Sequence, residues 1–217
     1  MKKITLYAVR HGQTLFNLLK RTQGWCDSPL TETGILQAKC VSAGMEHIPF
    51  TKAFSSPSER AMDTANLILG DRDIPLVLLK NLKEMNFGTL EGQDESDNFT
   101  GKYTQEEIQQ KRIEAGGETP QQVADRVVLA LNEIYERCED GDVVLVGTHG
   151  LYLSYMLSYA YKMEPFAFMK EMHEKHIPIM ENCVIHQFRY DGETFEVTDL
   201  ANVEYRNKGA AKLGVTL

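Results

Sequence analysis

The sequence predicts an α/β fold with three layers, α/β/α, around a mostly parallel sheet with an antiparallel edge. Short apolar segments alternate with amphipathic helical segments along the chain. The run Asp-Val-Val-Leu-Val-Gly at 142–147 has the continuous apolar character of a buried parallel strand. Near the end of the chain, two β-favouring segments are joined by Asp191-Gly192, a pair typical of a tight hairpin turn. This hairpin supplies the antiparallel edge.

The alternation places the individual elements in order. Strands are expected at 4–9, 52–55, 76–79, 142–147, 183–190 and 194–200, and helices at 31–46, 56–69, 119–138 and 150–162. The inner face of the first helix is expected to carry Ile35, Leu36, Ala38, Val41 and Met45. Ser56-Pro57-Ser58-Glu59 matches a capping box with proline at the first helical position, and so is predicted to open the second helix.

Residues 86–118 differ from the rest of the chain. They are rich in glycine and polar residues and contain only a weak helical stretch around 106–112. We interpret them as a cap-like insertion in a single domain that spans residues 1–217.

Composition narrows the classes of partner. The chain has 217 residues and a formal net charge of −8, so nucleic acid and anionic membranes are poor partners. Its apolar runs are too short to span a membrane, and a cytoplasmic location is expected. The four cysteines are far apart in the sequence and are expected to be reduced, packed thiols: Cys26, Cys40, Cys138 and Cys183.

Arginine or histidine follows three of the predicted parallel strands. Arg10 and His11 follow the first, His149 follows the strand at 142–147, and Arg60 lies in the first turn of the helix after 52–55. Ligands of open α/β sheets bind beyond the carboxyl ends of the strands. Arginine opposes the dipole at a helix N-terminus, which indicates a use such as binding an anion. Each residue alone is more often solvated, but their joint placement favours an anion site.

The segment Leu6-Tyr7-Ala8-Val9-Arg10-His11-Gly12-Gln13-Thr14, with Asn17 after it, resembles the signature of the histidine phosphatase superfamily, which has the phosphoglycerate mutase-like fold. Further blocks of the chain resemble the family in the same order, over nearly the whole length. They are Gln23-Gly24-Trp25, the run from Ser55 to Ala61, Leu82-Lys83-Glu84, Gly117-Glu118-Thr119 with Arg126, the run from Val146 to Gly150, and Asn182-Cys183 before the last strands.

The resemblance implies a role for each matching residue. His11 attacks phosphorus and becomes a phosphohistidine, and Glu84 acts as general acid and base. Arg10, Arg60 and His149 contact the transferring oxygens. The remaining substrate-binding positions are Asn17, Gln23, Gly24 and Gly150. Glu91 is the alternative to Glu84, since several carboxylates lie close together in this part of the sequence. No cofactor or metal is implied, the expected partner is a small phosphorylated metabolite, and a homodimer stays open.

The chemistry sets two requirements on the titratable groups. His11 must be neutral to attack, and nearby Arg10 and Arg60 should disfavour a second positive charge. Its other ring nitrogen is expected to donate to a backbone carbonyl, which fixes the tautomer. Glu84 must start protonated, so its surroundings are expected to raise its pKa.

A phosphomonoester hydrolase is the favoured function. The main alternative is a cofactor-dependent phosphoglycerate mutase. Gln93-Asp94-Glu95 stands where mutases tend to offer lysine, and acidic residues there would repel a doubly charged acid, although Lys102, Lys111 and Arg112 keep the mutase open. A non-catalytic module that binds phosphorylated ligands is a second alternative. A metal site on His173 and His176 is a third, less favoured than solvated surface.

Several large side chains lie in segments that could form the mouth of the pocket. Such a mouth would suit an ester with an apolar or aromatic part, and ordinary packing accounts for these residues equally well. The residues are Phe16, Trp25, Phe87, Phe99, Tyr103, Leu151 and Tyr152.

Overall fold

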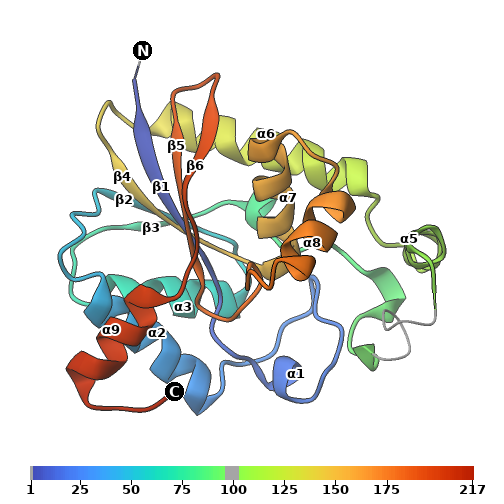
Figure 1. Ribbon diagram of the computed structural model, residues 1–217, viewed down its shortest axis with the longest axis horizontal. Helices are drawn as coiled ribbons and strands as arrows, with labels where there is room; N and C mark the ends of the chain where they lie inside the picture. The colour runs from blue at the N-terminus through green and yellow to red at the C-terminus, as the bar shows by residue number, and fades with distance from the viewer. Residues whose placement is uncertain (1, 96–102) are drawn as a thin grey trace.

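A computed structural model describes residues 2–95 and 103–217, and its strands form one mixed sheet (Figure 1). The strand order is β3-β2-β4-β1-β5-β6. The first four strands pair in parallel and the last two antiparallel, as the sequence predicts. The strands are β1 (Ile4–Arg10), β2 (Lys52–Ser55), β3 (Leu76–Leu78), β4 (Val143–Thr148), β5 (Ile185–Tyr190) and β6 (Phe195–Asn202).

The three strands that carry the predicted anion site are neighbours. Arg10 at the end of β1 pairs with Thr148 at the end of β4, and Ser55 at the end of β2 pairs with Gly147. Parallel pairing in this register brings the carboxyl ends of all three strands to one edge of the sheet. The residues that follow these strands therefore meet although they are far apart in sequence.

Helices cover both faces of the sheet (Figure 1). One face packs α2 (Glu32–Gly44), α3 (Glu59–Leu69) and α9 (Glu204–Leu213), and the other packs α6 (Pro120–Arg137), α7 (Gly150–Tyr161) and α8 (Pro165–Glu174). A short helix, α1 (Leu15–Leu18), follows β1. None of the helices in the described ranges is long and apolar enough to cross a membrane.

The predicted capping box at residues 56–59 is wrong. The N-cap is Ser58, the helix starts at Glu59, and no side chain caps it. Ser56 continues the pairing of β2 with β4, because its backbone N–H donates to Gly147 O at 2.9 Å. Its hydroxyl lies 2.8 Å from His149 Nε2 and accepts from the N–H of Ser58 at 3.3 Å, so it bonds next to the helix start without capping the helix.

The inner face predicted for the first helix is confirmed at Ala38, Val41 and Met45, which are buried, and is wrong at Ile35, which is 37% exposed. Cys40, outside the predicted face, is also buried. It lies against α9, which packs so closely on α2 that a Cβ on Gly44 or Gly209 would collide with the backbone of the facing helix. The sequence did not indicate α9, because its few apolar residues give little helical periodicity.

The segment 86–118 leaves and re-enters the fold at one place. The N–H of Asn86 donates to Glu118 Oε2 at 2.8 Å, and the N–H of Glu118 donates to Asn86 O at 2.9 Å. Its described parts include the 3₁₀ helix η2 (Gly88–Leu90) and α5 (Gln105–Glu114). Another 3₁₀ helix, η1 (Lys80–Leu82), precedes it. Two residues considered in the sequence, Phe99 and Lys102, lie outside the described residues.

Candidate active site

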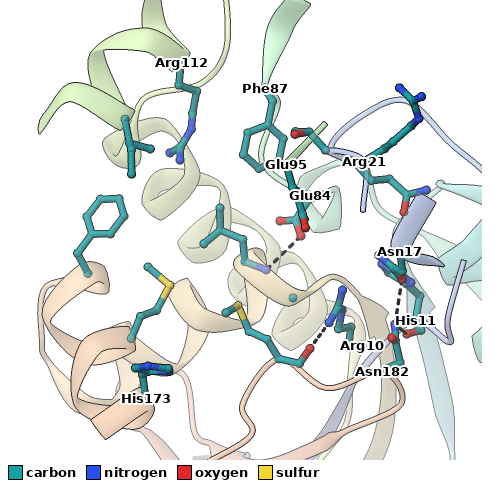
Figure 2. Close-up of a pocket in the computed structure, with 18 of the residues that line it drawn as sticks. Arg10, His11, Asn17, Arg21, Glu84, Phe87, Glu95, Arg112, His173 and Asn182 are labelled. Atoms are coloured by element: carbon teal, nitrogen blue, oxygen red, sulfur yellow. Dashed lines mark hydrogen bonds between the residues drawn. The ribbon is translucent and has the colours of Figure 1, made fainter. Parts of the chain in front are cut away.

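A cavity of about 940 Å³ opens at the carboxyl ends of β1 and β4 (Figure 2). Six of the predicted site residues line it: Arg10, His11, Asn17, Gln23, Glu84 and Gly150. The other three, Gly24, Arg60 and His149, are not in its lining. They are nevertheless tied to the site, since Arg60 bonds Gly24 O at 2.8 Å and the ring of His149 lies 5.4 Å from that of His11.

His11 is held in a single orientation. Its backbone N–H donates to Thr148 O at 3.0 Å, and its ring Nδ1 lies 2.8 Å from Gly12 O. A carbonyl oxygen can only accept, so Nδ1 carries the proton and Nε2 has the free lone pair. Burial, followed by the charges of Arg60 and Arg10, holds the pKa of His11 well below its usual value. The expected neutral ring is therefore present, with burial as its largest cause.

Arg60 is 1% exposed although it is an arginine. Its Nη1 donates to Asp27 Oδ1 at 2.8 Å and to Cys26 O at 3.0 Å. With the bond to Gly24 O, these contacts fasten the 24–27 loop to the start of α3. Asp27 partly balances the charge of Arg60 from a half-buried position. Sequence reasoning did not assign Asp27 a role.

His149 is the N-cap of α7 and is buried. Its Nε2 lies 2.8 Å from the Ser56 hydroxyl. Burial, then Arg60, His11 and Arg10, hold its pKa well below the usual value. Its Nδ1 and the Nε atoms of Arg10 and Arg60 are buried without a hydrogen-bond partner among the described residues. Buried polar atoms are rarely left unpaired, so these three nitrogens indicate a ligand.

Glu84 lies on the cavity wall and is buried (Figure 2). Its Oε1 accepts from the N–H groups of Met85 and Tyr152, each at 2.9 Å, and Oε2 accepts from Leu151 N–H at 3.1 Å. Burial raises the pKa of Glu84, although these hydrogen bonds and Arg60 oppose the rise. The direction agrees with the expectation for a general acid.

Glu91, the alternative to Glu84, has a different environment. Its carboxylate accepts from the N–H groups of Trp25 at 2.8 Å, Phe87 at 3.0 Å and Cys26. It is absent from the cavity lining. These bonds hold the 24–26 loop, so the geometry gives Glu91 a structural position and leaves Glu84 facing the cavity.

Arg126 fixes the backbone around Glu84. It donates to the carbonyl oxygens of Lys83 at 2.9 Å and Glu84 at 3.2 Å, and its Nε lies 2.7 Å from Glu118 Oε1. The family block pointed to Arg126 and Glu118 without giving their contacts. Because both side chains are largely buried, their pair stiffens the segment that carries the carboxyl group.

The segment between α8 and β5 contributes two contacts that the sequence did not reveal, one through a backbone carbonyl and one through a side chain. The Nη1 of Arg10 donates to Met180 O, and the Nδ2 of Asn182 donates to His11 O at 3.0 Å (Figure 2). Asn182 stood in the last block that resembles the family, and that position was the available signal. This segment thus holds both residues of the Arg10-His11 pair.

The predicted pocket mouth is largely wrong. Of its described residues, only Phe87 and Leu151 line the cavity, and Tyr152 belongs to the core. The remaining apolar wall includes Ile108 of α5 and Phe166 and Met169 of α8. The sequence missed the α8 contribution because its apolar residues face two directions and mask the helical period.

The two histidines considered as metal ligands do not form a cluster. His173 lines the cavity, while His176 lies beyond the end of α8 in left-handed backbone, with its Nδ1 3.1 Å from His173 O. Within 2–95 and 103–217, no group of three or more His, Cys, Asp and Glu side chains could hold a metal ion.

Residues 6–203 match the model of the histidine phosphatase superfamily (branch 1). The chain is 36% identical over 154 residues to the 2,3-bisphosphoglycerate-dependent phosphoglycerate mutase 2 of Gloeobacter violaceus, covering 67% of this chain and 70% of the relative. It is 44% identical over 86 residues to the adenosylcobalamin/alpha-ribazole phosphatase of Salmonella typhimurium, covering 40% and 43%. The crystal structure of a phosphoglycerate mutase from Bacillus anthracis str. Sterne superposes with a TM-score of 0.79 and 27% identity, over 96% of this chain and 97% of that one.

Proposed function

We propose that this chain, which belongs to the histidine phosphatase superfamily (branch 1), hydrolyses phosphate monoesters through a phosphohistidine on His11. The observation that carries the proposal is the neutral imidazole of His11 at the cavity wall, with Nδ1 bonded to Gly12 O. Arg10, Arg60 and His149 each add one buried side-chain nitrogen that has no hydrogen-bond partner in the described part of the chain. We propose a small phosphorylated metabolite as the class of substrate.

In the first half-reaction, the lone pair on His11 Nε2 attacks phosphorus and forms a P–N bond. The ester P–O bond breaks, and the leaving oxygen takes the proton of the Glu84 carboxyl group. Arg10, Arg60 and His149 stabilise charge on the non-bridging oxygens of the phosphoryl group. The products are a free alcohol, ionised Glu84 and phosphohistidine.

In the second half-reaction, ionised Glu84 removes a proton from water as the water oxygen attacks phosphorus. The P–N bond breaks, its electron pair returns to Nε2, and inorganic phosphate leaves. His11 is again neutral and Glu84 again protonated, so the site returns to its starting state. Burial raises the pKa of Glu84, which favours the protonated form that the first half-reaction needs.

Transfer of the phosphoryl group to water, and not back to an acid, is supported by the acidic turn after Gly92. Glu95 lines the cavity and would repel a doubly charged phosphoglycerate. The likeness to a phosphoglycerate mutase makes the mutase the competing reaction. A buried carboxyl group with a raised pKa and a neutral imidazole in the same cavity support catalysis over a non-catalytic binding module, which needs neither.

The fate of the phosphoryl group separates these reactions. We expect the protein, given p-nitrophenyl phosphate and an excess of glycerate, to release inorganic phosphate in equal amount to p-nitrophenol. Phosphoglycerate in the products, or a priming requirement for a bisphosphorylated glycerate, would instead assign the mutase. If neither inorganic phosphate nor phosphoglycerate forms, the non-catalytic binding module is the remaining function.

A further inference from the structure

The cavity extends well beyond the phosphate end. Its volume of about 940 Å³ lies at the top of the range for drug-sized ligands, roughly 300–1,000 Å³. Figure 2 shows His11 and Asn17 at one side of the cavity and Arg112 and His173 at the other. A phosphorylated three-carbon acid bound at His11 would leave the second side unfilled.

Two sides of α8 carry apolar residues: one is buried in the core, and the other lines the cavity, with Met169 also touching the core cluster. Phe168 and Met172 are buried in the core, whereas Phe166 and Met169, three residues apart, are half-buried and line the cavity. Leu151, at the start of α7 beside Glu84, adds a further apolar residue to the cavity lining. An apolar face that borders an open cavity gains stability when a ligand removes it from water.

From this wall we propose that the substrates are phosphate monoesters of bulky alcohols whose apolar body lies against α8. This inference rests on the proposed hydrolysis and adds the class of leaving group. The phosphate would sit at His11, and the alcohol would extend past Glu84 toward Phe166 and Met169.

Two primary alkyl esters test the inference, because their leaving groups have similar basicity. We expect kcat/KM for 4-phenylbutyl phosphate to exceed that for ethyl phosphate by about 10-fold or more. The double variant Phe166→Ala/Met169→Ala should bring the ratio close to one. Met163→Ala is the matched control, since Met163 packs against the core beside α8 and is absent from the cavity lining.

A wild-type ratio near one, or a ratio that the double variant leaves unchanged, would overturn the inference. Binding of 4-phenylbutylphosphonate against ethylphosphonate, measured by calorimetry, gives the same comparison without turnover. A third outcome is that neither ester is hydrolysed, while 4-phenylbutylphosphonate still binds more tightly than ethylphosphonate and loses this advantage in the double variant. That outcome would overturn the proposed reaction and support the apolar binding site on α8.

A separate observation concerns His186, a fully buried histidine of β5 outside the cavity lining. Its Nε2 donates to Ile179 O at 2.9 Å, and its Nδ1 accepts from Ala201 N–H at 3.1 Å. Burial lowers the pKa of His186 to about 4, so the ring is neutral at pH 7. Both ring nitrogens are thus committed to the backbone.

The segment anchored by His186 is the one that holds the Arg10-His11 pair. Met180, whose carbonyl accepts from Arg10, follows Ile179 directly, and Asn182 bonds His11 O. Among residues 2–95 and 103–217, the Nε of Arg10 has no hydrogen-bond partner. The geometry points to His186 as a positioning residue that fixes the 179–182 segment and, through Met180 O, the guanidinium of Arg10.

Two polar variants isolate the bond to Ile179. Asn at position 186 can accept from Ala201 N–H but is too short to reach Ile179 O, whereas Gln carries a donor at about the distance of Nε2. We expect His186→Asn to lower kcat/KM by between about 10-fold and 100-fold, and His186→Gln to restore most of it. In an Arg10→Ala background, His186→Asn should have little further effect.

Equal activity of the Asn and Gln variants, or an equal loss from His186→Asn in both backgrounds, would overturn this assignment. Affinity for orthophosphate is a second readout, and it should weaken in His186→Asn but not in His186→Gln. Thermal unfolding of each variant separates loss of fold from loss of position. Because orthophosphate binding needs no turnover, this test stands apart from that of hydrolysis.

Discussion

The variant His11→Ala is expected to lose at least about a thousandfold in turnover of p-nitrophenyl phosphate, because it lacks the proposed nucleophile. Wild-type protein quenched during turnover should carry an acid-labile, base-stable phosphoryl group. That group should be absent from the variant. Detection by ³²P transfer or intact mass after a rapid alkaline quench would measure both effects.

His47→Ala is the matched control for this experiment, since His47 is exposed and remote from the cavity lining. It should retain the wild-type rate and the phosphoprotein. Robust turnover by His11→Ala, or a phosphoryl group that survives the substitution, would overturn the central proposal. The pocket around Arg10, Arg60 and His149 would then bind phosphate for another purpose.

The variant Glu84→Gln is expected to slow phosphoenzyme formation from an alkyl phosphate by about 10²–10⁴-fold, the usual contribution of a general acid. The effect should be smaller for p-nitrophenyl phosphate, whose leaving group departs without a proton. Hydrolysis of the phosphohistidine also needs Glu84 as base. The variant should therefore accumulate phosphoenzyme from p-nitrophenyl phosphate, visible by intact mass.

The pH dependence of phosphoenzyme formation is an independent test of Glu84 as the general acid. Glu84 must be protonated in this step, and burial raises its pKa, so the rate should fall as pH rises through that raised value. The falling limb should vanish in Glu84→Gln. In Glu91→Gln it should persist, because the Glu91 carboxylate is bonded to backbone N–H groups away from the cavity. The reverse pattern would assign the acid to Glu91.

The phosphate end of the site could be predicted from the sequence because its residues follow strands. Arg10, His11 and His149 each come directly after a strong apolar run, and parallel pairing alone brings them to one edge. Glu84 is harder, since it follows a short strand and a 3₁₀ helix with other carboxylates nearby. In the structure, its place in the cavity lining and its contacts with the start of α7 separate it from Glu91.

The leaving-group end could not be predicted, because tertiary contacts decide it. Phe166 and Met169 line the cavity because Phe168 and Met172 fix the neighbouring side of α8 in the core. Ser56 does not form the expected capping box, because its pairing with Gly147 competes with helix formation. Local propensity predicts neither the orientation of α8 nor the position of Ser56, because it depends on each segment alone and not on its tertiary neighbours.

The paired bonds between Asn86 and Glu118 have a consequence for how such a protein can diversify. A segment whose two ends already meet can be exchanged for another of different length, since the span to be bridged stays constant and added length costs only slowly in closure entropy. Arg126 anchors Glu118 from outside the exchanged stretch, on α6. The segment between Asn86 and Glu118 could thus be replaced, and the proposed leaving-group preference changed, while the positions of His11 and Glu84 stay the same.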